Sequence, residues 1–289
     1  MTGTNAIAGF FAELQRRRVL HIGGVYIAGA WLGAEILTFL LEQAMAPAWS
    51  FRLLAIVFVV GFPGGMVLAV VSQIRQIGAN SLGLIFFTAA FPGMVLGLQG
   101  YYTLRKFGSA GMLGSAVSLS LLREMGPVLT ALMVTGRAGS AMCAEIGIMR
   151  NSEQLDALEC MAVDPFRYLI SPKFIATLIS IPLLTMVFNV VGIFGGYLAG
   201  VQMLGVNPGA FFSGMESSVV NKDITMGIIK SLVFAILIVW ICTGRGYFVH
   251  QINGSGYGAE GVSRVTTQAV VLSSISILVW DYILTAMLL

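Results

Sequence analysis

Long apolar stretches separated by short polar connections constrain this chain more than any other feature. A helix needs about 20 mostly apolar residues to cross the hydrocarbon core of a bilayer, and seven stretches of the sequence reach or approach that length. None of them alternates apolar with polar residues as the strand of a membrane barrel does. We therefore expect an all-α, polytopic membrane helix bundle. The stretches run roughly over Val19–Leu41, Leu53–Val71, Ser81–Leu104, Met125–Ile148, Phe174–Leu204, Met226–Thr243 and Gln268–Leu289.

The composition excludes the water-soluble classes of protein. Charged residues make up 10% and hydrophobic residues 57% of the 289 positions, and the mean hydropathy is +0.89. Soluble domains carry about 25% charged residues, so a chain with less than half of that share cannot cover a globule with ionic groups. Intrinsic disorder needs low hydrophobicity and high charge, and it is excluded for the same reason.

Basic residues set the expected orientation, because Lys and Arg concentrate in the cytoplasmic loops of membrane proteins. Three arginines stand just before the first apolar stretch and place the N-terminus in the cytoplasm, and seven crossings then place the C-terminus on the outer side. In this topology the cytoplasmic basic residues outnumber the external ones. The cytoplasmic set is Arg16, Arg17, Arg18, Arg75, Arg150, Arg167, Lys173, Arg245 and Arg264, and the external set is Arg52, Arg105, Lys106 and Lys222.

Arg123 and Glu124 stand together where the fourth apolar stretch is expected to enter the membrane, next to the Gly126-Pro127 break. An ionisable side chain inside a membrane segment costs a few kcal/mol on insertion scales, and it marks a substrate path by default. We therefore expect a functional role for this pair.

Four further charged residues lie within the fourth, sixth and seventh apolar stretches, and helix-to-helix pairing is their expected role. Arg137 and Glu145 lie two turns apart on one helical face, which is too far for direct contact without a third group. Lys230 lies near the start of the sixth stretch and Asp281 within the seventh. Each of these charges needs an opposite charge or a backbone carbonyl on another helix.

Small residues recur at four-residue intervals in three of the stretches. Such stripes let the backbones of neighbouring helices approach closely in a bundle or a dimer. The sequence therefore predicts a tightly packed bundle. The stripes are Gly93 and Gly97; Gly136, Ser140 and Ala144; and Gly192, Gly196 and Gly200.

The segment between the fourth and fifth stretches predicts a short helix at the cytoplasmic surface. Asn151 is expected to cap it in a capping box with Gln154, and Asp164-Pro165 to end it. This helix would carry an apolar stripe beside an acidic one. Anionic lipid headgroups would repel the acidic stripe, so a cytoplasmic protein partner is favoured over a helix that lies on lipid. The apolar stripe is Leu155, Leu158, Met161 and Ala162, and the acidic stripe is Glu153, Asp156 and Glu159.

Catalytic and cofactor motifs are absent from the sequence or lack their structural context. There is no G-x-x-x-x-G-K-[ST] pattern, so the chain does not bind ATP through a P-loop. A G-x-G-x-x-G match at 256–261 follows no strand and opens no βαβ unit. The three cysteines are far apart and the two histidines isolated, which predicts neither a metal site nor a catalytic triad. There is no basic patch for nucleic acid.

Several segments carry a resemblance to a known family. These segments are 93–100 (GMVLGLQG), 122–132 (LREMGPVLTAL), 136–141 (GRAGSA), 144–147 (AEIG), 153–159 (EQLDALE), 161–165 (MAVDP), 229–234 (IKSLVF) and 258–267 (GAEGVSRVTT). Through them the chain from about Gln76 to its end resembles the MlaE-type permease family, the membrane subunits of ABC systems that work with MCE-domain proteins on lipids.

The resemblance implies five core transmembrane helices in a permease domain over 76–289, a homodimer, and a coupling helix seated on a separate cytoplasmic ATPase that binds the ATP. It implies an inner-membrane protein that is not itself an enzyme and needs no cofactor. The implied activity moves glycerophospholipid between the inner membrane and a periplasmic MCE-domain protein, and thereby maintains the lipid asymmetry of the outer membrane in a Gram-negative cell.

Two groups of residues are carried over by position. The first would line a central lipid cavity, and the second would contact the ATPase. The first group is Arg123, Glu124, Leu96, Gln99, Thr103, Phe107 and Met125, and the second is Glu153, Gln154, Leu155, Asp156, Leu158 and Glu159.

Residues 1–75 depart from the family pattern, which usually begins with an amphipathic interfacial helix. They comprise a basic segment and a hydrophobic hairpin, and they resemble a membrane hairpin at the N-termini of some bacterial cyclase and repeat proteins.

Two other functional classes stay open. A secondary transporter would show inverted repeats, which the sequence lacks, and a non-transporting assembly scaffold would need no buried charge at Arg123 and Glu124.

Overall fold

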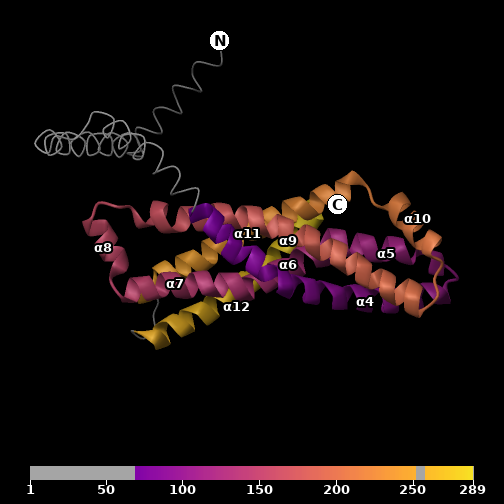
Figure 1. The fold of residues 1–289 in the computed structure, drawn as a ribbon, viewed down its shortest axis with the longest axis horizontal. Coiled ribbons are helices and arrows are strands. Elements are labelled where there is room, and N and C mark those ends of the chain that lie inside the picture. Colours follow the sequence, from indigo (N-terminus) through magenta and orange to yellow (C-terminus); the bar gives the residue numbers. More distant parts are fainter. Residues whose placement is uncertain (1–68, 252–257, 289) are drawn as a thin grey trace, which may run out of the picture. The chain divides into compact units, whose positions relative to one another are not determined.

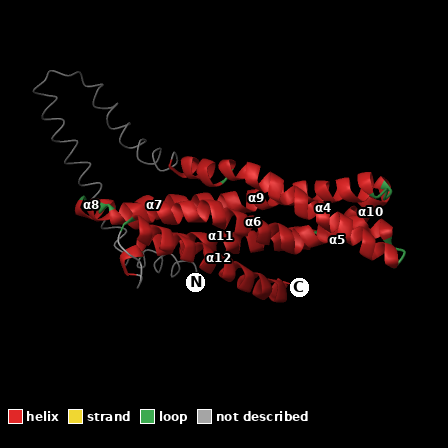
Figure 2. Ribbon diagram, turned by 90° about the horizontal axis from the view of Figure 1, so that it is seen from below, coloured by secondary structure: helices red, strands yellow, loops and turns green. Residues whose placement is uncertain are grey.

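A computed structural model describes residues 69–251 and 258–288 of the chain. Nearly all of these residues are helical, and the described ranges contain no strand. Figures 1 and 2 show long helices lying side by side in an elongated bundle. The predicted all-α membrane bundle is confirmed.

Five helices of the described ranges are long and apolar enough to cross a membrane: Ala69–Lys106, Ala110–Asn151, Phe166–Met203, Asn221–Tyr247 and Ala259–Leu288. They match the five core helices that the sequence predicts. The N-terminal hairpin lies outside the described residues. The predicted boundary between residues 75 and 76 falls within helical residues 69–77, and the division into two domains stays a prediction.

Shorter elements make up these spans and the connections between them. The α-helices are α4 (Leu82–Lys106), α5 (Leu113–Ser120), α6 (Gly126–Val134), α7 (Ser140–Asn151), α8 (Gln154–Cys160), α9 (Ser171–Tyr197), α10 (Pro208–Ser218), α11 (Asn221–Tyr247) and α12 (Ala259–Leu288). The π-helical segments are η3 (Leu121–Met125), η4 (Thr135–Gly139), η5 (Phe166–Ile170) and η6 (Leu198–Met203). Single 3-10 turns are η1 (Ala79–Ser81), η2 (Ala110–Met112) and η7 (Val249–Gln251).

The second span is longer than the sequence predicts. It runs without a break for 42 residues, from Ala110 to Asn151, which is about 63 Å of helix against a hydrocarbon thickness of about 30 Å. The expected start at Met125 was wrong, because the serines, Arg123 and Glu124 dilute the hydropathy of the first part. Arg123 and Glu124 therefore lie well inside a continuous helix, in its π-helical segment η3.

Glycines bring α4 and α9 into backbone contact, as the small-residue stripes predict. A Cβ atom built on Gly93 would overlap the backbone of Gly192, and one built on Gly97 would meet the backbone of Gly196 at 2.8 Å. The stripe that begins at Gly136 behaves differently, because a Cβ there meets no described atom within 4 Å. The predicted close contact is confirmed for two stripes, and the third faces away from the bundle at Gly136.

The two ends of the described bundle differ in their connections. At one end, α8 joins α7 to the third span, and at the other end, α10 lies against α5 (Figure 1). Asn207 caps α10 by accepting a hydrogen bond from the Gly209 amide at 2.8 Å, and Ser115 of α5 donates to the Gly214 carbonyl at 2.7 Å. The α10 connection is thereby fixed to the second span.

The outer faces of α4 and α12 are strongly apolar. Phe87 and Phe91 of α4 are 66% and 62% exposed, and Leu278 and Val279 of α12 are also exposed. A soluble monomer rarely shows an apolar surface of this extent. These faces fit contact with lipid acyl chains.

Substitution of Gly93 by Ala tests the α4–α9 contact. Overpacking of a close contact costs about 1–3 kcal/mol, so we expect G93A to lower the thermal midpoint of the purified protein in detergent. G83A is the matched control on the same helix, because a Cβ at Gly83 meets nothing within 4 Å and Ala has the higher helix propensity. Equal midpoints for the two variants would contradict the contact.

Candidate functional site

Lys230 of α11 is completely buried and lies at the centre of a charged cluster. Its Nζ donates to Glu124 Oε2 at 2.6 Å and to Asp281 Oδ1 at 2.9 Å. It also donates to the Thr285 hydroxyl at 2.7 Å, and that hydroxyl donates in turn to the backbone carbonyl of Asp281. The cluster joins the second span, α11 and α12. A buried ammonium is tolerable only with such partners, since an unpaired ion in the interior costs several kcal/mol.

Arg123 is held by a second ion pair. Its Nε donates to Asp223 Oδ1 at 2.7 Å, and Asp223 Oδ2 accepts the backbone amide of Val220 at 3.0 Å. Asp223 is almost fully buried. The pair therefore ties η3 to the first turn of α11, one residue away from the Glu124 contact with Lys230.

The remaining intramembrane charges also pair between helices, as predicted. Arg137 Nη1 donates to the Ser81 hydroxyl at 2.7 Å, and the buried Lys173 donates to Glu145 Oε2 at 2.5 Å. Arg137 and Glu145 have different partners, which confirms that their spacing is too long for direct contact.

A groove of about 570 Å³ runs along α4 and η6. Gln99 and Thr103, both predicted for the lipid cavity, line it. The other predicted cavity residues are not among its lining. Leu96 and Met125 pack against the buried core, and Phe107 is highly exposed at the end of α4. The lining is Met94, Val95, Leu98, Gln99, Tyr102, Thr103, Lys106, Ala199 and Met203.

This α4/η6 groove combines apolar walls with a few polar groups at one end. Its position follows from the chain, because α4 ends at Lys106 just before η2 and η6 ends at Met203 just before α10. The groove therefore lies toward the α10 end of the bundle, away from α8. A site of this size and lining fits an acyl chain with a polar headgroup beside it.

The short helix between the second and third spans is present as α8, but it begins differently from the prediction. Asn151 ends α7, and its side chain donates to the Gly258 carbonyl at 2.9 Å. The residue before α8 is Glu153, whose φ of 58° makes a sharp turn. The predicted capping box was wrong, because a left-handed residue redirects the chain at this point.

Few contacts attach α8 to the bundle. Leu155 is its buried residue, while Glu153, Asp156 and Glu159 are exposed, as the acidic stripe predicts. Met161 is 65% exposed, so the predicted apolar stripe splits between the bundle and the surface. The α8 segment thus presents exposed carboxylates, with Met161 exposed directly after the helix, at one end of the described bundle.

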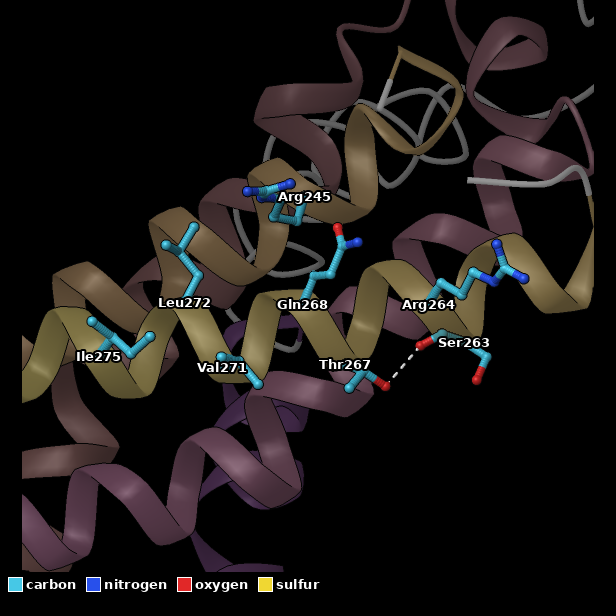
Figure 3. Close-up of a pocket in the computed structure, with 8 residues that line it drawn as sticks. All are labelled: Arg245, Ser263, Arg264, Thr267, Gln268, Val271, Leu272 and Ile275. Atoms are coloured by element: carbon cyan, nitrogen blue, oxygen red, sulfur yellow. Dashed lines mark hydrogen bonds between the residues drawn. The ribbon is translucent and has the colours of Figure 1, made fainter. Parts of the chain in front are cut away.

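A second groove, of about 550 Å³, lies between α11 and α12 nearer the α8 end. Figure 3 shows Gln268 between Arg245 of α11 and Arg264 of α12. Arg264 donates to Glu260 at 2.6 Å. This groove contains none of the residues predicted for either site. Its lining is Arg245, Ser263, Arg264, Thr267, Gln268, Val271, Leu272 and Ile275.

Comparison with known proteins identifies the family. The model of the family described as Permease MlaE matches residues 70–287. The chain belongs to the MlaE permease family. It is 48% identical over 219 residues to the intermembrane phospholipid transport system permease protein MlaE of Haemophilus influenzae, covering 75% of this chain and 82% of that protein. It is 40% identical over 248 residues to a probable ABC transporter permease protein of Rickettsia bellii, covering 86% and 93%.

A more distant relative is the chloroplast protein TRIGALACTOSYLDIACYLGLYCEROL 1 of Arabidopsis thaliana, 34% identical over 214 residues that cover 74% of this chain and 59% of the relative. As an MlaE permease, this chain is the membrane subunit of an ABC transporter, and ATP hydrolysis lies in a separate subunit.

Two residues of these ion pairs were not predicted from the sequence: Asp223, and Lys173 as the partner of Glu145. A signal for Lys173 was present, because two spans joined by a short connection run antiparallel. Glu145 near the end of one span and Lys173 near the start of the next must therefore lie at a similar depth. Asp223 stands in the first turn of a helix, where a carboxylate is favoured.

Replacement of Lys230 by Met tests the charged cluster. Removal of one partner of a buried ion pair costs about 3–5 kcal/mol, so K230M should lower the thermal midpoint markedly, and E124Q/D281N in the same chain should recover part of the loss. K222M is the control, because Lys222 is exposed on the same helix. A K230M midpoint equal to that of K222M would contradict the cluster.

Proposed function

We propose that this chain is the inner-membrane permease of an ABC transporter that moves glycerophospholipids between the membrane and a periplasmic MCE-domain protein. In this proposal the transport maintains the lipid asymmetry of the outer membrane. The permease works as a homodimer with a cytoplasmic ATPase, and the α8 end of the bundle faces the cytoplasm.

The observation that carries the proposal is α8. It lies at one end of the bundle, between two long helices, with one buried anchor at Leu155 and exposed carboxylates around it. A short helix of this kind can be displaced as a unit by a partner protein. Because the chain lacks a P-loop, the energy for transport comes from that partner.

The α4/η6 groove supports a lipid as the transported molecule. Its walls are mainly apolar, and Gln99, Thr103 and Lys106 supply polar groups for a headgroup. It lies toward the α10 end, which is the periplasmic end in the proposed orientation. The relative from Haemophilus influenzae carries phospholipid transport in its name, and we extend that substrate class to this chain.

A second copy of the chain would complete the lipid chamber. The groove is open along the exposed face of α4, where Val95, Leu98 and Tyr102 point outward. A pair of such faces would enclose acyl chains between two bundles. The homodimer is thus part of the proposal.

Transport then follows from two states of the dimer. Closure of the ATPase pushes on Glu153–Glu159, the push travels through the bundle, and the chamber changes its width. The two states must bind lipid with different affinity, since a ligand indifferent to the state cannot be moved by the change.

Charge reversal on α8 tests the proposal. We expect E153K/D156K/E159K to reduce co-purification of the ATPase by about tenfold or more, because each acidic contact with a basic partner becomes repulsive. E216K is the control, since Glu216 is exposed on α10 at the opposite end. Both variants should keep the thermal midpoint of the parent within a few degrees. Undiminished binding of the ATPase to the triple variant would remove α8 from the interface.

A further inference from the structure

Tyr247, the last residue of α11, contacts α8 and also the segments that precede and follow α8 in the chain. Its hydroxyl donates to Glu159 Oε1 of α8 at 3.3 Å. The guanidinium of Arg150, which precedes α8, lies over its ring at 5.6 Å from the centroid. The ring of Phe166, which follows α8, lies 4.7 Å away between centroids. One aromatic side chain therefore contacts α8, the residue Arg150 before it and the residue Phe166 after it.

These contacts matter because α8 has few others with the residues that the structure describes. Leu155 is its buried residue, and the helix lies against α7. The polar ties of α8 in the described ranges are the Glu159 contact and an ion pair between Asp156 and Arg150 at 2.6 Å. Arg150 also lies over the ring of Tyr247. Both polar contacts of α8 therefore involve either Tyr247 or a residue that packs on its ring.

The end of α11 is itself fixed. A Cβ built on Gly246 would meet the Cys143 carbonyl oxygen at 2.7 Å and Ile146 Cβ at 3.1 Å, so α11 lies directly against the α7 backbone beside Tyr247. Tyr247 cannot shift along α7 without disturbing this contact.

The same helix carries Lys230, about 26 Å along the axis from Tyr247. Helix α11 is unbroken over Asn221–Tyr247 and has no proline. Lys230 binds Glu124 and Asp281. A displacement of α8 that moves Tyr247 is thus passed along a rigid element to the charged cluster. Rigid secondary elements are among the structures that carry energetic coupling between distant sites.

We propose that Tyr247 is a positioning residue that couples α8 to α11 and thereby links ATP hydrolysis in the partner to lipid movement. This inference rests on the proposed function. It assigns Tyr247 no contact with lipid or ATP. Tyr247 acts by holding Glu159 and Arg150, so its loss should separate hydrolysis from transport.

The test uses the complete complex of permease, ATPase and MCE-domain acceptor in proteoliposomes. The readouts are ATPase co-purification, the rate of ATP hydrolysis, and labelled phospholipid delivered per ATP hydrolysed. For Y247L, which keeps an apolar side chain but no ring or hydroxyl, we expect bound ATPase and continued hydrolysis with about fivefold less lipid per ATP. Y247F keeps the ring for Arg150 and Phe166 and should recover most of the ratio.

W240A is the matched control, because Trp240 is an aromatic residue of α11 that is 74% exposed; its lipid-to-ATP ratio should equal that of the parent. An unchanged ratio in Y247L overturns the inference, and so does release of the ATPase from Y247L, which would give Tyr247 a docking role. Failure of the parent complex to deliver lipid in an ATP-dependent way would instead overturn the proposed function.

Discussion

The pairing of buried Lys230 is the interaction on which the rest of the structure depends. An ammonium with no exposed surface has to meet carboxylates, and it meets them on the second span and on α12. Three of the five spans are thereby fixed in depth and rotation at one point. The Arg123–Asp223 pair is a second ion pair between η3 and α11, while glycines hold α4 and α9 in backbone contact.

These constraints make the described bundle a stiff connector between two different ends. The α8 end presents carboxylates on a weakly attached helix, and the α10 end carries the groove between α4 and η6. Helices joined by buried charges and glycine contacts move together, because neither kind of contact tolerates gradual sliding. In the proposed function, a force applied at α8 would reach the groove through this bundle without a mobile element between them.

The sequence predicts the five core spans, the glycine contacts and the short helix after the second span. It cannot predict partners, because spacing places a residue on a face but does not say which helix that face meets. Glu124 needed a cation, yet its choice of Lys230 depends on the rotation of α11. The capping prediction at Asn151 failed for a different reason, since Glu153 adopts the left-handed conformation directly before α8 and Asn151 ends α7 instead.

The most direct test is ATP-dependent transfer of a labelled phospholipid by the reconstituted permease, ATPase and MCE-domain protein, measured as lipid exchanged between vesicle and acceptor. The account predicts transfer that requires hydrolysable ATP and stops with a non-hydrolysable analogue. Hydrolysis by a fully assembled complex with no movement of lipid would contradict it.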